Sequence, residues 1–183
     1  MIDGTKMLEI ISGRQSDRKY SNRAVEKEKL DRIAEAARIS PSACNGQPWK
    51  FIVITDPAVL KKISDAALNK VLRLNSFIHQ APAMIVVVRM GTNISSQIGG
   101  TIKAKDYSLV DLGIASENIC LQAEAEGLGS CMVGWFDENM VKKILSIPRS
   151  KRVELIITIG YSTAEQREKR RKPKMEVVSY NKY

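Results

Sequence analysis

Histidine and cysteine are scarce in this chain of 183 residues, and their scarcity narrows the chemistry it can perform. His79 is the only histidine, which excludes any catalytic or metal site that needs two histidines from one chain. The three cysteines, Cys44, Cys120 and Cys131, form no C-x-x-C pair. Their odd number fits neither a disulfide framework nor a four-cysteine zinc site. We therefore expect no bound metal and a reducing, cytoplasmic setting.

Long apolar runs and glycine-rich phosphate loops are also missing. The longest apolar run, residues 81–88, is far shorter than the ~20 residues that span a bilayer as a helix. The N-terminus carries no signal-peptide pattern. No G-x-G-x-x-G follows a predicted strand, and no G-x-x-x-x-G-K-[ST] occurs. We expect no membrane partner, and any phosphate must be held mainly by side chains.

Hydrophobic periodicity predicts helices and strands that are mixed without strict alternation, which favours an α+β fold over a doubly wound parallel sheet. The predicted helices cover residues 5–12, 26–39, 56–69, 106–126 and 137–145, and the predicted strands cover 51–54, 84–88, 130–135 and 153–159. Residues 90–105 are predicted to form a long loop, and 175–180 a last short strand or extended arm. No repeat or linker divides the chain, so we expect one domain over residues 1–183, with 164–183 as a C-terminal arm.

The predicted helix over residues 106–126 is apolar almost all round and about 32 Å long at 1.5 Å per residue. Such a helix must be covered on every face. One domain of this size could cover it alone, whereas a dimer interface would do so more easily. We favour the dimer.

Positive charge exceeds negative charge, with 29 Lys and Arg against 20 Asp and Glu, a formal net charge of +9. Much of the excess lies in two clusters, at residues 14–23 and 167–174. A basic balance suggests an anionic partner: nucleic acid, a membrane surface or a phosphate-bearing ligand. Aromatic residues are only 5% of the chain, and neither cluster contains an RNP-like aromatic motif, which disfavours a nucleic-acid module. Arg14 and Arg18 offer two guanidinium groups that suit a phosphate, but composition alone also allows a solvated surface.

Four segments together resemble the nitroreductase family of FMN-dependent oxidoreductases. They are R-Q-S-D-R-K-Y at 14–20, the segment 37–51, G-W-F-D-E at 134–138 and K-R-R-K-P at 169–173. The most specific part is P-S-A-C-N-G-Q-P-W at 41–49. The segments follow the family's order over nearly the whole chain. The short length of the chain resembles that of the small nitroreductase-like branch of the family. The resemblance implies a nitroreductase-like fold: a mixed, mostly antiparallel sheet flanked by helices, with a long central helix at a dimer interface.

The resemblance also implies a homodimer with two FMN sites, each built from both subunits. The implied FMN-binding residues are Arg14, Gln15, Ser16 and Arg18 for the phosphate, ribityl chain and pyrimidine edge; Pro41, Ser42, Ala43 and Asn45 from the partner subunit; Val133, Gly134 and Trp135 along the ring, with a backbone N–H near N5; and Lys169 and Arg171 at the phosphate. Asn75 is the nearest match to a polar residue that touches the flavin. No catalytic side chain is expected, because the flavin carries the redox chemistry.

The function that the resemblance implies is reduction of a second substrate by NAD(P)H, with ping-pong kinetics and nitroaromatics or quinones as plausible acceptors. Two alternatives stay open: a flavin-binding module without turnover, and a basic nucleic-acid-binding module. Ser42 and Asn45 could simply be turn residues. Arg170, Lys172 and Lys174 are either solvated surface or attract the phosphates of NADPH.

Overall fold

A four-stranded antiparallel sheet forms the centre of the molecule in the computed structural model, which describes residues 3–68, 75–91 and 106–183. The strands are β1 (Trp49–Ile54), β2 (Ala83–Arg89), β3 (Gly129–Val133) and β4 (Arg152–Gly160), in the order β1-β2-β4-β3. A parallel bridge between Ser16 and Ser130 places the N-terminal segment beside β3. The sheet is therefore mostly antiparallel, and the predicted α+β class is confirmed.

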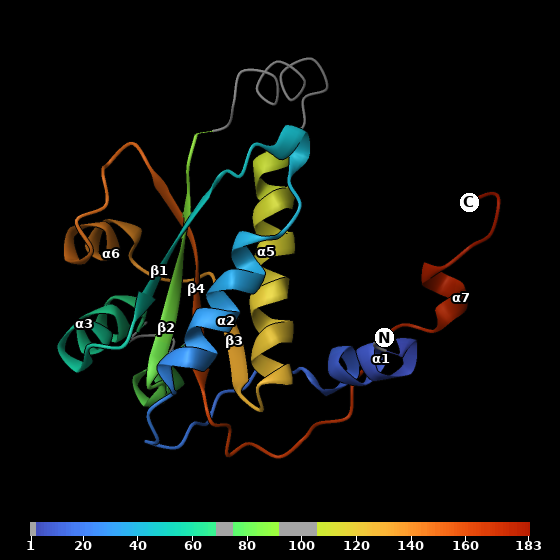
Figure 1. Ribbon diagram of the computed structural model, residues 1–183, viewed down its shortest axis with the longest axis horizontal. Coiled ribbons are helices and arrows are strands. Elements are labelled where there is room, and N and C mark those ends of the chain that lie inside the picture. The colour runs from blue at the N-terminus through green and yellow to red at the C-terminus, as the bar shows by residue number, and fades with distance from the viewer. Residues whose placement is uncertain (1–2, 69–74, 92–105) are drawn as a thin grey trace.

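Helices cover both faces of the sheet (Figure 1). On one face lie α2 (Lys27–Arg38) and the long α5 (Tyr107–Ala125); on the other lie α3 (Pro57–Ala67), η2 (Ser76–Gln80) and α6 (Glu138–Ile144). Successive side chains of a strand point to opposite faces, so β2 serves both cores. Met84, Val86 and Val88 pack in one apolar cluster, and Ile85 and Val87 in the other. This central position explains why the strand is apolar from Ala83 to Val88.

The predicted helix starts at Asp56 and Asp137 are confirmed by hydrogen bonds. Asp56 Oδ1 accepts from the Ala58 and Val59 N–H groups at 2.8 and 2.9 Å, and Asp137 Oδ1 accepts from the Met140 N–H at 2.9 Å. Such side chains satisfy N–H groups that have no partner inside the helix. The helix predicted to reach residue 69 ends, as α3, at Ala67. Most of the predicted loop over 90–105 lies outside the described residues.

Of the two alternatives predicted for residues 175–180, a short strand or an extended arm, the strand is wrong. In its place the chain forms one helical turn, α7 (Lys174–Val177), closed by a hydrogen bond of 2.9 Å from the Val178 N–H to the Lys174 carbonyl. Every residue from 171 to 183 is exposed, and none of them belongs to the sheet. A strand needs a neighbouring strand for its backbone hydrogen bonds, and here the segment leaves the body of the molecule beyond α1 (Gly4–Gly13) (Figure 1).

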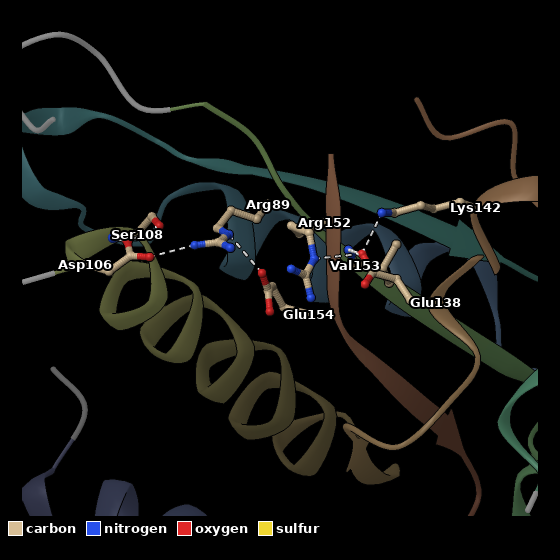
Figure 2. A network of polar contacts seen from close by, with 8 residues as sticks. All are labelled: Arg89, Asp106, Ser108, Glu138, Lys142, Arg152, Val153 and Glu154. Atoms are coloured by element: carbon tan, nitrogen blue, oxygen red, sulfur yellow. Dashed lines mark hydrogen bonds and ion pairs between the residues drawn. The ribbon is translucent and has the colours of Figure 1, made fainter. Parts of the chain in front are cut away.

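Ion pairs attach the N-terminal end of α5 and the helix α6 to the sheet (Figure 2). Arg89, the last residue of β2, places Nη1 2.6 Å from Asp106 Oδ2 and Nε 2.8 Å from Glu154 Oε1 on β4. Asp106 caps α5, so this group joins the helix to two strands. A second group surrounds the Glu138 carboxylate of α6, whose Oε1 lies 2.8 to 3.0 Å from Lys142 Nζ, Arg152 Nε and the Val153 N–H.

One apolar face of α5 is left uncovered within a single chain. Leu109, Val110 and Ile114 expose 48%, 49% and 38% of their surface. The neighbouring α1 buries none of its residues and exposes three further apolar side chains, Met7, Leu8 and Ile11. No helix among the described residues is both long and apolar enough to cross a membrane.

Candidate active site

A cavity of about 620 Å³ lies between the segment that follows α1 and the segment that follows β4. Its walls come from residues almost a chain length apart in sequence. The lining residues are Arg14, Gln15, Ser16, Arg18, Arg167, Glu168, Lys169, Arg170 and Arg171. The six residues that the sequence suggested for the phosphate, the ribityl chain and the pyrimidine edge of FMN therefore all line this one cavity.

Gln15 joins the two walls of this cavity. Its Nε2 donates to Asp17 Oδ1 and to the Glu165 carbonyl, both at 3.1 Å. Its Oε1 accepts from the backbone N–H of Arg167 at 3.1 Å and from the Nε of the same residue at 3.3 Å. Both polar ends of the amide are thus used inside the protein, so Gln15 shapes the cavity.

Lys169 and Arg14 bring two positive charges close together in the lining of the cavity. Lys169 Nζ donates to the carbonyl oxygens of Ile11, at 3.1 Å, and Arg14. Burial, and next the charges of Arg14 and Arg171, lower the pKa of Lys169. Arg14 Nε is buried and lies 3.1 Å from Glu117 Oε1, without the geometry of a hydrogen bond to any described residue. The cavity therefore holds crowded cations that an anion would stabilise.

Asp17 organises the segment that carries these cations, a role that the sequence analysis missed. Its side chain is buried and its Oδ1 accepts from Ser162 Oγ at 2.6 Å as well as from Gln15. Its backbone N–H donates to the Ser130 carbonyl at 2.9 Å, and its carbonyl accepts from the Tyr20 hydroxyl at 2.8 Å. Asp17 thereby fixes residues 14–18 against β3.

Asn75 and Trp135 meet beside the end of β3. Asn75 has a left-handed backbone, with φ of 62°, and its Nδ2 donates to the Trp135 carbonyl at 2.9 Å and to the Ala67 carbonyl at 3.2 Å. Val133, the last residue of β3, is buried, whereas Trp135 is 60% exposed. A Cβ built on Gly134 would meet a single atom within 4 Å, Leu155 Cδ2 at 3.9 Å. The backbone at Gly134 is therefore open to a planar ligand.

Phe77 connects this open backbone to the basic cavity. The guanidinium of Arg18 lies over the Phe77 ring, 5.9 Å from its centre, and Phe77 itself is buried in the core. Phe77 belongs to η2, the turn that begins next to Asn75. One short helix thus contacts both the Arg18 cation and, through Asn75, the backbone of Trp135. The sequence offers no local signal for this contact.

The segment 41–45 lies away from the cavity in the same chain. It includes η1 (Ala43–Asn45), where the Ala43 N–H donates to Asp111 Oδ1 at 3.0 Å. Asp111 and Glu117, the partner of Arg14, are separated by about 9 Å along α5 and about 120° around it, at 1.5 Å and 100° per residue. Pro41, Ser42, Ala43 and Asn45 are therefore not brought to the Arg14 cavity within one chain.

The fold and the site have counterparts among known proteins. Residues 11–76 and 69–161 match the Nitroreductase family. A protein of Archaeoglobus fulgidus that is named, by inference, as an NADH dehydrogenase/NAD(P)H nitroreductase is 34% identical over 163 residues, with 87% of each chain covered. The chain belongs to the nitroreductase family.

Two solved structures show the same fold at similar length. A nitroreductase family protein from Clostridium novyi NT is 32% identical, with a TM-score of 0.75 over 86% of this chain and 85% of that one. An FMN-dependent nitroreductase from Clostridium difficile R20291 is 29% identical, with a TM-score of 0.77 over 96% of this chain and 99% of that one. The resemblance seen in the sequence is thus confirmed.

The side chains at the cavity fit a flavin mononucleotide in chemical type. Guanidinium and ammonium groups are the donors that bind phosphate monoesters best, and Arg14 Nε is a buried donor still without a hydrogen bond among the described residues. The open backbone at Gly134 leaves space where a flat ring could approach. Residues 41–45, which the family resemblance also assigns to the flavin site, do not line this cavity in the same chain.

Proposed function

We propose that the protein is an FMN-dependent oxidoreductase that uses NAD(P)H to reduce a second substrate, with nitroaromatic or quinone-like compounds as acceptors. When bound, FMN supplies the redox chemistry, because it accepts a hydride from a nicotinamide and passes it on. The reaction then follows ping-pong kinetics, with the oxidised nicotinamide leaving before the acceptor enters. The observation that carries this proposal is the basic cavity between residues 14–18 and 167–171, in a chain of the nitroreductase family.

In this proposal Arg14, Ser16, Lys169 and Arg171 hold the phosphate, and Arg18 lies near the pyrimidine edge of the ring. A fixed cation at that edge stabilises negative charge that develops there during reduction. The backbone of Gly134 and Trp135 presents an N–H near N5. The amide of Asn75 holds this backbone in place through its hydrogen bond to the Trp135 carbonyl.

The working unit in this proposal is a homodimer with two FMN sites. The exposed apolar residues of α5 and α1 would be covered by the partner, since an uncovered patch of this kind marks an interface. The same arrangement brings residues 41–45 of the partner to each cavity, which a single chain does not do. The C-terminal segment 164–183, which is exposed throughout from residue 171, is proposed as an arm of each subunit.

The visible spectrum of the purified protein tests the proposal. We expect a yellow protein whose flavin absorbance bleaches on mixing with NADPH or NADH and returns when a quinone is added. A protein that stays colourless after incubation with FMN would refute flavin binding. Bleaching by neither nicotinamide in a yellow protein would leave a flavin-binding module without turnover.

Arg14→Ala provides the matching test of the site. Loss of a hydrogen bond to a charged group costs about 1.5–3 kcal/mol, so the Kd for FMN should rise roughly 10- to 100-fold. Lys62, an exposed residue of α3, supplies the control. If Arg14→Ala and Lys62→Ala bind FMN with equal affinity, Arg14 does not contribute to FMN binding.

A further inference from the structure

The basic cavity carries more positive charge than one flavin phosphate needs. Among its nine lining residues are five arginines and one lysine, against the single carboxylate of Glu168, a formal charge of +5. A phosphate monoester carries about −1.5 to −2 near pH 7. Glu117, which is outside the lining, pairs with Arg14 at 3.1 Å, so about two positive charges are left over after one such group is bound. They lie on residues that line one cavity.

The cations at this cavity fall into two groups according to what their side chains already contact. Lys169 is tied to the carbonyls of Ile11 and Arg14, and Arg167 Nη2 donates to the Ser16 carbonyl at 2.7 Å. These contacts fix the cations as part of the walls. The charge on each remains, because a backbone carbonyl does not neutralise it.

Arg170 belongs to the other group. It lines the cavity and is exposed, and within the described part of the chain its guanidinium has no hydrogen bond and no ion pair. The carbonyl of Arg170 accepts a hydrogen bond from Arg171 Nη1 at 2.9 Å, which leaves the guanidinium itself unengaged by the described residues. Lys172 and Lys174 follow on the same exposed segment. The cavity thus has a free guanidinium at its rim, with two further ammonium groups next to it in sequence.

We propose that Arg170, with Lys172 and Lys174 beyond it, binds the 2′-phosphate that distinguishes NADPH from NADH, so that this enzyme selects NADPH. The proposal rests on the function proposed above and adds the choice of hydride donor. A guanidinium presents paired N–H donors that match a phosphate, and an arginine is a common partner of the 2′-phosphate in dinucleotide sites. A nucleic acid is a poorer occupant, because none of the lining residues is aromatic and none can stack on a base.

Steady-state kinetics with both nicotinamides test the selection directly. With a quinone at saturation, we expect kcat/KM to be at least tenfold higher for NADPH than for NADH. Arg170→Ala should lower this ratio about tenfold through the KM for NADPH. Arg149→Ala, which removes an exposed arginine outside this cavity, should leave the ratio as it is. Equal kcat/KM values for the two nicotinamides in the wild-type protein would overturn the proposal.

Equilibrium binding separates this proposal from the proposed function. Calorimetry on the yellow holoprotein should show adenosine 2′,5′-bisphosphate binding at least tenfold more tightly than 5′-AMP, with the difference lost in Arg170→Ala and reduced by salt. Inorganic phosphate should compete only weakly. If it competes as well as the bisphosphate, the rim is a general anion site and the proposal fails. A holoprotein that neither nicotinamide bleaches would refute the proposed function, whereas the calorimetry would still report on Arg170.

Discussion

Gly129, the first residue of β3, leaves just enough space for the Asp17 carboxylate. A Cβ at position 129 would lie 2.7 Å from both Cγ and Oδ2 of Asp17, and 2.8 Å from Ser162 Cβ. Both neighbours belong to the group that holds residues 14–18 in place, since Ser162 donates to Asp17 at 2.6 Å. Gly129→Ala should therefore push the carboxylate out of its position and loosen the segment that carries Arg14 and Arg18.

The expected size of the effect follows from these contacts. Overpacking costs about 1–3 kcal/mol, and a weakened hydrogen bond to a buried carboxylate adds about 1.5–3 kcal/mol when lost entirely. A loss of about 2–4 kcal/mol in the free energy of unfolding is expected. For a chain of this size it corresponds to a fall of roughly 5–15 °C in Tm, measured by circular dichroism. FMN titration should show a Kd at least about tenfold higher, because the cavity wall has moved.

Two further variants make this prediction refutable. Gly4→Ala is the control, since a Cβ there would meet no atom within 4 Å, and it should leave Tm and FMN affinity as they are. In a double-mutant cycle, Gly129→Ala should destabilise the Asp17→Ala variant by at least about 1 kcal/mol less than it destabilises the wild-type protein, because the carboxylate it would collide with is gone. An unchanged Tm and Kd in Gly129→Ala, or additive effects in the cycle, would show that this packing does not order the site.

Three other predictions follow from contacts outside this group. Phe77→Leu should remove a cation–π contact with Arg18 worth about 0.5–1 kcal/mol and weaken FMN binding two- to fivefold by fluorescence titration, whereas Phe77→Tyr should not. The hydrogen bond from Arg32 lowers the pKa of Glu126 to about 2, so this carboxylate stabilises the fold above its unfolded pKa and the stabilisation is lost as pH falls toward 2. Glu126→Gln should therefore be less stable than wild type in urea at pH 7, by under about 1 kcal/mol, and this difference should shrink as pH falls through 2. Gly113→Trp, on the exposed face of α5, should shift the sedimentation coefficient to that of a monomer and reduce FMN content; a full dimer with full FMN would contradict the proposed interface.

Hydrophobic pattern predicted the order and type of the elements well, because the sheet and its helices are built from local sequence signals. The apolar run in β2 indicated a buried strand, and Asp56 and Asp137 marked helix starts. The C-terminal strand failed because alternation of Met175 and Val177 describes a strand only where another strand is available to pair with it. Whether another strand lies beside this segment depends on the tertiary structure, and a local hydrophobic pattern carries no information about it.

The same division holds at the candidate site. Motif resemblance placed Arg14 and Lys169 in one site, and the structure brings them to one cavity. The motif could not reveal that Asp17 is buried, because its burial depends on Gly129 and Ser162, which are more than 100 residues further along the chain. Contacts between residues so far apart in sequence form only in the tertiary structure. Residues that act by positioning others, such as Asp17, are therefore hard to identify from sequence motifs.

The pairing of the two cavity walls has a consequence for the order in which this protein matures. Lys169 is hydrogen-bonded to the carbonyl of Ile11, 158 residues earlier in the chain. At a synthesis rate of about 5–20 residues per second, roughly 8–30 seconds pass between the synthesis of Ile11 and that of Lys169. The cavity is therefore complete only after residues 167–171 have been synthesised. A message cut short just after β4 would yield all four strands of the sheet but only one wall of the cavity.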